Sequence, residues 1–178
     1  AIYDAPPPRR RLELHRAIAD AVEARAAATG ELEEASEALA FHRRAGEQWG
    51  AAFRHLLASG HRAAARGGLA EASALYQQAL EVADAAEAAG PERLDLLEAL
   101  GRLQLTLAET QAATRTFQAA AELAGPDGWR PDAEQRARAR RQEALALVAA
   151  GRPERALPLL EKLAASPSPP PRALAALG

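Results

Sequence analysis

One short pattern recurs along this chain and restricts the fold more than any other feature. Within residues 67–80, a small residue, an aromatic residue and a second small residue stand at Ala72, Tyr76 and Ala79. Spacings of four and then three place these side chains on one face of a helix. The pattern returns once closely and once faintly: Ala113, Phe117 and Ala120, and then Ala156, Leu160 and Leu163. A unit that recurs in this way is typical of helical repeat proteins.

A further small residue stands 12 positions before each clear copy, at Gly60 before Ala72 and at Gly101 before Ala113. We expect these four small residues to let the two helices of a hairpin approach closely. The aromatic residue would then fill the space between that hairpin and the next one.

Alanine and leucine must fill the core, because hydrophobic residues make up 48% of the 178 residues but aromatic residues only 4%. Alanine has the highest helix propensity, and the scarcity of Val, Ile and Thr argues against strands. Glycine and proline breaks predict about eight helices, over residues 9–30, 31–45, 47–66, 69–89, 91–107, 109–124, 132–150 and 153–165. We therefore predict an all-α solenoid of antiparallel helix hairpins.

The two ends of the chain differ in composition from the middle. Residues 1–8 end in three prolines, so we expect an extended proline linker there. Residues 9–165 form the predicted repeat domain. Residues 166–178 are predicted to be a Ser/Pro-rich linker followed by the start of a truncated helix. Because the chain contains no methionine, we expect a piece of a longer protein; the alternative is a processed or engineered start.

Composition excludes several classes of function. The formal net charge of -2 provides no broad positive field for nucleic-acid binding. The absence of cysteine excludes disulfides, thiolate metal sites and cysteine catalysis. No apolar run reaches the length of about 20 residues that a membrane helix needs. We therefore expect a cytoplasmic protein that binds neither nucleic acid nor membrane directly.

Catalytic chemistry is only weakly indicated. No phosphate-binding loop is present, because the single lysine, Lys162, follows Glu161. Four acidic residues crowd one stretch: Glu31, Glu33, Glu34 and Glu37. A solvated helix face, whose acidic first turn suits the helix dipole, explains them better than paired catalytic carboxylates. We therefore expect no enzymatic activity, no cofactor and no metal.

A helical enzyme or metal-binding protein is an alternative from a different class, and it would use His42, His55 and His61. His55 and His61 are six positions apart and do not share a helix face, and no H-E-x-x-H motif is present. Such a site would therefore need contacts between separate helices.

Residues 97–104 read L-x2-L-G-x2-Q, and residues 113–120 read A-x3-F-x2-A. This resembles the tetratricopeptide pattern, with W-x2-L-G-x2-Y on the first helix of a pair and A-x3-F-x2-A on the second. A third unit, with Ala144 and Ala156 at the small positions, fits poorly. The units are 41 and then 43 residues apart, whereas standard repeats have about 34 residues.

Long, alanine-rich repeats of this kind are similar to those in large bacterial signalling proteins. These include LuxR-type regulators of the maltose-activator class and nucleotidyl cyclases fused to STAND-type ATPase modules. Residues 3–19 resemble the junction after the winged-helix part of those modules, where a proline turn and an Arg-Arg…His motif precede the first solenoid helix. Residues 45–52, which contain Trp49, resemble an early turn of the same solenoids. The resemblance covers about residues 1–165 and implies a right-handed α-solenoid of TPR-like hairpins.

In that family, such repeats bind an inducer or a partner protein and relay the result to the ATPase and to an output domain. The resemblance therefore implies a non-catalytic sensor or protein-interaction segment that works with other domains of its parent chain. The first helix of each pair lines a concave groove with its second, fifth and ninth positions. The resemblance places these positions at Arg54, Leu57 and His61 in the first unit, at Asp95, Glu98 and Arg102 in the second, and at Arg138, Arg141 and Leu145 in the third. Arginine at both ends suits a carboxylate or phosphate on the ligand.

Two further possibilities stay open. A stand-alone adaptor that binds an extended peptide would come from a gene without an ATPase or DNA-binding region. A homodimer through the ends is the other, because a solenoid without capping helices exposes apolar faces.

Overall fold

The computed structural model describes residues 7–32, 34–125 and 128–165. Within these ranges every regular element is an α-helix, which confirms the predicted all-α, eight-helix architecture. The helices are α1 (Pro8–Thr29), α2 (Ser36–Ala45), α3 (Trp49–Ala65), α4 (Leu69–Val82), α5 (Gly90–Thr106), α6 (Thr110–Glu122), α7 (Ala133–Ala149) and α8 (Pro153–Ala165). None of these eight is long and apolar enough to cross a bilayer. The expectations for residues 1–6 and 166–178 lie outside the described residues.

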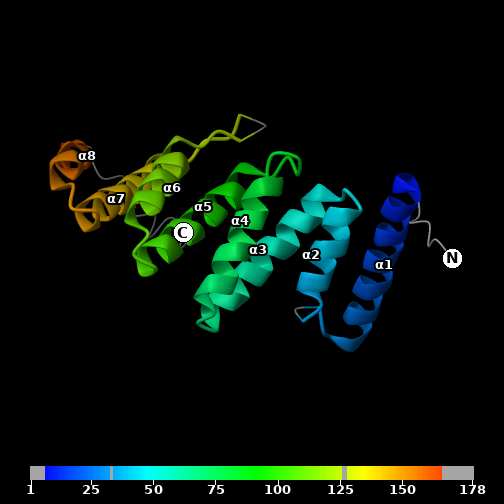
Figure 1. Cartoon of the computed structure of the whole chain (residues 1–178). Coiled ribbons are helices and arrows are strands. Elements are labelled where there is room, and N and C mark those ends of the chain that lie inside the picture. The colour runs from blue at the N-terminus through cyan, green and yellow to red at the C-terminus, as the bar shows by residue number, and fades with distance from the viewer. Residues whose placement is uncertain (1–6, 33, 126–127, 166–178) are drawn as a thin grey trace, which may run out of the picture.

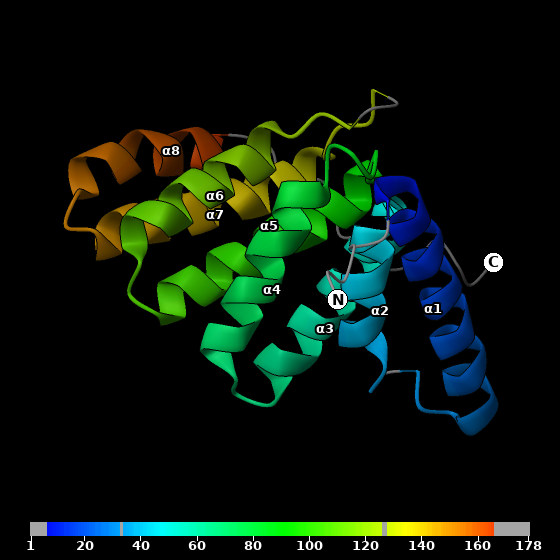
Figure 2. The same ribbon diagram turned by 45° about the vertical axis from the view of Figure 1, so that its right-hand side comes forward.

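Each helix packs against the one that follows it in the chain, from α1 on α2 to α7 on α8. Figure 1 shows the helices in chain order, with α1 at one end of the row and α8 at the other, and Figure 2 shows the same row from a second direction. α3 also touches α5 past the intervening α4. Sequential pairwise packing of this kind is consistent with a helical repeat arrangement.

In each clear hairpin, the aromatic ring of the second helix lies against the glycine of the first. A Cβ atom at Gly60 would lie 2.4 Å from Cε1 of Tyr76, and one at Gly101 would lie 2.7 Å from the Phe117 ring. Both rings are buried, at 2% and 0% exposure. Only glycine fits so close to a ring, which supports the predicted need for a small residue at Gly60 and at Gly101.

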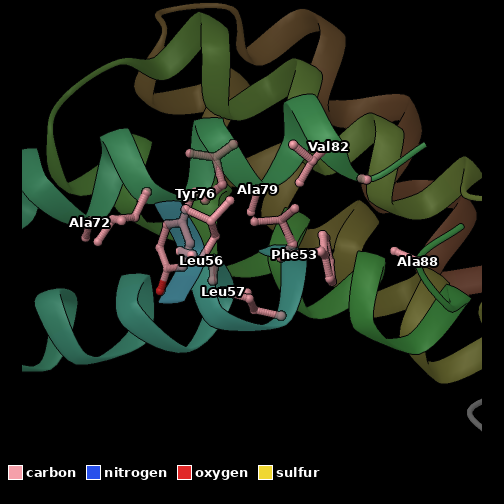
Figure 3. Close-up of a cluster of buried hydrophobic side chains, with 14 of the residues drawn as sticks. Phe53, Leu56, Leu57, Ala72, Tyr76, Ala79, Val82 and Ala88 are labelled. Atoms are coloured by element: carbon pink, nitrogen blue, oxygen red, sulfur yellow. The ribbon is translucent and has the colours of Figure 1, made fainter. Parts of the chain in front are cut away.

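The largest cluster of buried apolar side chains is shared by α2, α3, α4 and α5. Phe53 of α3, Tyr76 of α4 and Leu100 of α5 all belong to it, and Figure 3 shows side chains of α3 and α4 gathered there. The clusters beyond α5 are smaller. The last hairpin is held by a cluster of only three buried residues: Ala144, Leu147 and Ala156.

Polar contacts attach α1 to α2, and one of them involves a buried cation. α1 itself buries only Ala19 and Ala26. Arg43 of α2 is 6% exposed and pairs with two carboxylates of α1, with Nη1 2.7 Å from Oδ1 of Asp20 and Nη2 bound to Glu23. The position of α1 therefore depends on polar contacts as well as on the burial of two alanines.

The first hairpin differs in two details from the sequence prediction. α1 begins at Pro8, which the sequence pattern assigns to the extended linker. A proline fits the first helical turn, because the N–H that it lacks has no partner there. Gly30 ends α1 with a φ of 76°. α2 then begins at Ser36 rather than at residue 31, because the described residues between them form the turn that reverses the chain.

α4 ends at Val82 rather than at residue 89. The following residues form turns in which Glu87 has a φ of 47°. This turn buries Ala88 and brings Gly90, the first residue of α5, against the ring of Trp129. The packing of the next helix therefore overrides the high helix propensity of an alanine-rich stretch.

Candidate functional site

The predicted groove residues come from α3, α5 and α7, the first helices of three successive hairpins. The structure brings two pairs of them together across the hairpins. Nε2 of His61 on α3 lies 2.9 Å from Oδ2 of Asp95 on α5, and Glu98 of α5 pairs with Arg138 of α7. These four residues and Arg102 form what we call the polar row.

A hydrogen-bonded chain runs from the core to the surface where α3 meets α5. The Tyr76 hydroxyl lies 2.9 Å from Nδ1 of His61, whose other ring nitrogen faces Asp95. With Nδ1 accepting from the Tyr76 hydroxyl, the N–H on Nε2 is the group that donates to Asp95. Burial raises the pKa of Tyr76, and Asp95 adds to this effect while Arg102 opposes it. The phenol therefore stays protonated and remains a donor at neutral pH.

Glu98 is a buried carboxylate held by arginines from two helices. It is 8% exposed, and its Oε1 lies 2.8 Å from both Nε and Nη2 of Arg138. Nη1 of Arg102, one turn further along α5, lies 3.8 Å from Oε2. The rigid guanidinium of Arg138 pairs with Glu98 through two nitrogens, which links α7 to α5.

An open pocket of about 260 Å³ lies beside the His61–Tyr76 pair. Eight residues of α3, α4 and α5 line it: His61, Ala64, Leu69, Tyr76, Ala99, Arg102, Leu103 and Thr106. Half of these residues are apolar, and the other half, His61, Tyr76, Arg102 and Thr106, bring polar groups to the same hollow. Polar groups that converge beside apolar walls can orient a small molecule or a partner's side chain. The pocket spans two successive hairpins, so an occupant would contact both.

A second hollow, of about 320 Å³, lies between the end of α1 and the turn that follows. Its lining includes Arg25, Glu31 and Glu34, and Glu33 of the same acidic stretch lies outside the described residues. This hollow belongs to the first hairpin alone. The pocket between α3 and α5 is therefore the better candidate for a site that relates one hairpin to the next.

The remaining predicted groove residues are not joined to the polar row by any of the contacts described above. Leu57 is 8% exposed and belongs to the main core cluster, because α3 is covered by both α2 and α4. Its side chain packs in the core rather than facing a groove. Arg54 is exposed on α3, and Arg141 and Leu145 are exposed on α7.

Sequence reasoning treats Tyr76 as a packing residue and misses the role of its hydroxyl. The signal available was the contrast with Phe117, which stands at the same position of the next unit. Where a phenylalanine ring is sufficient for packing, a buried tyrosine indicates a hydrogen-bond partner for its hydroxyl.

The three histidines of the alternative metal or catalytic site have different surroundings. Nδ1 of His42 lies 2.9 Å from Nδ1 of His15, between α1 and α2. Burial lowers the pKa of His55 on α3, with Glu23 opposing this shift, and His61 belongs to the polar row. Across residues 7–32, 34–125 and 128–165, no group of three or more His, Cys, Asp or Glu side chains is placed to hold a metal ion.

No protein-family model, curated protein or solved structure matches this chain. The structure shows an all-helical domain whose eight described helices pack in sequential pairs. Inferences about function therefore depend on the geometry of the polar row and its pocket.

Proposed function

We propose that this chain is a non-catalytic, TPR-like sensor or protein-interaction segment of a larger bacterial signalling or transcriptional regulator. The surface formed by α3, α5 and α7 would bind an effector or a partner protein. The observation that supports this proposal most directly is the polar row. It links three successive first helices through His61–Asp95 and Glu98–Arg138, beside a pocket between two hairpins.

The charge of this surface favours an acidic occupant. Two carboxylates, Asp95 and Glu98, already have partners within the polar row, and the partners of Glu98 are Arg102 and Arg138. Four arginines belong to the same set of predicted positions, and two of them, the exposed Arg54 and Arg141, add positive charge beyond these pairs. Guanidinium groups bind carboxylates and phosphates through two parallel hydrogen bonds, so an acidic peptide or effector suits this surface best.

Binding at the pocket would change how the α3–α4 hairpin is oriented relative to the α5–α6 hairpin. An occupant that contacts His61 and Arg102 touches α3 and α5 at once. A change in the angle between these helices would be carried to α7 by the Glu98–Arg138 pair. A parent protein with two states of similar free energy would then shift toward the state that binds the occupant more tightly.

Calorimetry with a capped tetraglutamate peptide tests the binding surface. We expect Arg54→Glu and Arg138→Glu each to weaken binding about tenfold, a loss of about 1.4 kcal/mol. Circular dichroism checks that the helices are retained, since Arg138 is also the partner of buried Glu98. Arg115→Glu on α6 makes the same charge change at an exposed arginine outside the surface and should leave binding unchanged. Absence of binding, or an equal loss in the Arg115 variant, would contradict the proposal.

The regulator assignment has its own test, which is the reading frame upstream of the codon for Ala1. A P-loop ATPase and a winged helix encoded there would support a sensor segment of a regulator. A start codon within a few residues would instead favour the stand-alone adaptor that binds an extended peptide.

A further inference from the structure

The last hairpin exposes a position that is buried in the two hairpins before it. Tyr76 and Phe117, the aromatic residues of the two clear units, are 2% and 0% exposed. Leu160 stands at the equivalent position on α8, and it is 43% exposed. The difference arises because α5 covers α4 and α7 covers α6, whereas α8 is the last described helix of the row (Figure 1).

Leu160 is part of a larger exposed apolar surface. Leu157 on α8 is 57% exposed, and on α7 Leu145 and Val148 are 58% and 50% exposed. Spacings of three positions place the two residues of each helix on one side of it. We call these four side chains the end face. Several adjacent aliphatic side chains on a surface indicate an interaction site.

The earlier hairpins show what kind of element fits such a face. Tyr76 packs in one cluster with Leu96, Leu100 and Leu103 of α5. Phe117 packs in a cluster with Ala146 of α7. In both hairpins the covering element is a helix that presents alanine or leucine, and both types abound in this chain.

Charges beside the end face differ between its two helices. On α7, Arg141 stands four positions before Leu145 and shares its side of the helix. On α8, Glu154 and Glu161 stand three positions before and four positions after Leu157. The α7 side of the face is therefore basic, and the α8 side is acidic.

We propose that a second copy of this chain covers the end face, in a two-fold symmetric dimer. A two-fold interface joins the same surface of both subunits. When α7 of one copy lies on α8 of the other, the four aliphatic residues of each copy meet, and Arg141 faces the partner's Glu161. Because of the two-fold symmetry, the dimer contains this Arg141–Glu161 contact twice. The proposed dimer does not depend on ligand binding at the polar row.

Sedimentation equilibrium of the full chain, from micromolar to millimolar concentration, tests the proposal. We expect a concentration-dependent rise toward twice the chain mass of 18.8 kDa. Leu157→Glu should remove this rise, because it adds a third acidic group to the acidic side of the face. Leu80→Glu, at a side chain of α4 that is 42% exposed, is the matched control and should dimerise like the unchanged chain. Circular dichroism of both variants checks that the helices are retained.

A charge exchange tests the arrangement of the helices. Arg141→Glu and Glu161→Arg should each weaken the dimer about tenfold, and the double variant should recover most of the loss. A chain that stays monomeric at every concentration would overturn the proposal. This holds even where another part of the same chain covers the end face and so explains the monomer. Equal behaviour of the Leu157 and Leu80 variants would overturn it as well. A double variant that adds the two losses would exclude the α7-on-α8 arrangement.

Discussion

Tyr76 of α4 and His61 of α3 are joined by a hydrogen bond of 2.9 Å between the phenol hydroxyl and Nδ1 of the imidazole. The same phenol ring fills the space over Gly60, so one residue both closes the α3–α4 hairpin and orients a member of the polar row. His61 in turn reaches Asp95 of α5. Packing inside one hairpin is therefore linked to the position of the next.

Replacing Tyr76 by phenylalanine separates these two roles. Tyr76→Phe should lower the free energy of unfolding by about 0.5–1.5 kcal/mol, the usual contribution of one hydrogen bond. Packing of the ring should survive, because Phe117 fills the equivalent site. Tyr76→Ala removes the ring too and should cost about 3–5 kcal/mol. Urea denaturation measures both values, and an equal cost for the two variants would contradict the separation.

Two glycines of α3 should respond in opposite directions to alanine. A Cβ atom at Gly60 would lie 2.4 Å from Tyr76, whereas one at Gly50 would have no neighbour closer than 3.8 Å. Gly60→Ala should therefore destabilise the protein by about 1–3 kcal/mol through overpacking. Gly50→Ala, in the first turn of α3, should stabilise it by at most about 0.5–1 kcal/mol, the helix propensity difference for an interior position. Thermal unfolding of the pair checks the prediction, and a loss of stability in both would count against it.

Removing the two carboxylates that pair with Arg43 should cost more stability than removing Arg43 itself. Arg43 is buried, and within the described residues its Nε has no hydrogen-bond partner, whereas the side chains of Asp20 and Glu23 are 66% and 45% exposed. The double variant Asp20→Asn, Glu23→Gln leaves a buried charge with neutral partners alone, among them Gln48, and should cost about 1–3 kcal/mol. Arg43→Met leaves two carboxylates that water can reach, so it should cost less. Denaturation curves rank the variants, and the reverse order would refute this account.

Stability should fall as the solution is acidified through the histidine range. Burial, and secondarily the neighbouring His15, lower the pKa of His42, and burial lowers the pKa of His55. The unfolded chain, with histidine pKa values of about 6.5, then binds protons before the folded chain does. Stability is therefore complete above that value, and declines as the pH drops from it toward the lowered folded-state values.

Urea midpoints measured across this pH range test the linkage. The double variant His42→Gln, His55→Gln should have a flatter profile than the unchanged chain, because it removes two of the groups that take up protons on unfolding. An unchanged slope in the double variant would show that other groups cause the pH dependence.

The hairpins could be predicted from the sequence because their rule is local. A glycine on one helix and an aromatic residue 16 positions later, as with Gly60 and Tyr76, fix the face and the register of both helices. The ends of α2 and α4 could not be predicted in this way. Residues 31–35 and 83–89 have helix-forming compositions, but the chain must turn there so that the next helix can pack.

The polar row was partly predictable, since equivalent positions of successive first helices identified His61, Asp95, Glu98 and Arg138 as neighbours on one surface. The pairing among them was not, because it depends on how far each hairpin is rotated against the next. The burial of Leu57 was missed for a related reason. A side chain on α3 is buried because α2 and α4 both pack against that helix. The hydrophobic pattern of a single helix does not show how many other helices cover it.

The unequal clusters of buried side chains imply an order of opening along the row. α2 to α5 share one extensive cluster, whereas α7 and α8 meet over three small or aliphatic residues and α1 buries two alanines. In a linear array each unit is stabilised only by its neighbours, so local stability follows this distribution. Backbone amides in the middle of the row should exchange with deuterium most slowly. The two ends should open first, so that the centre of the row keeps its helices longest as the protein unfolds.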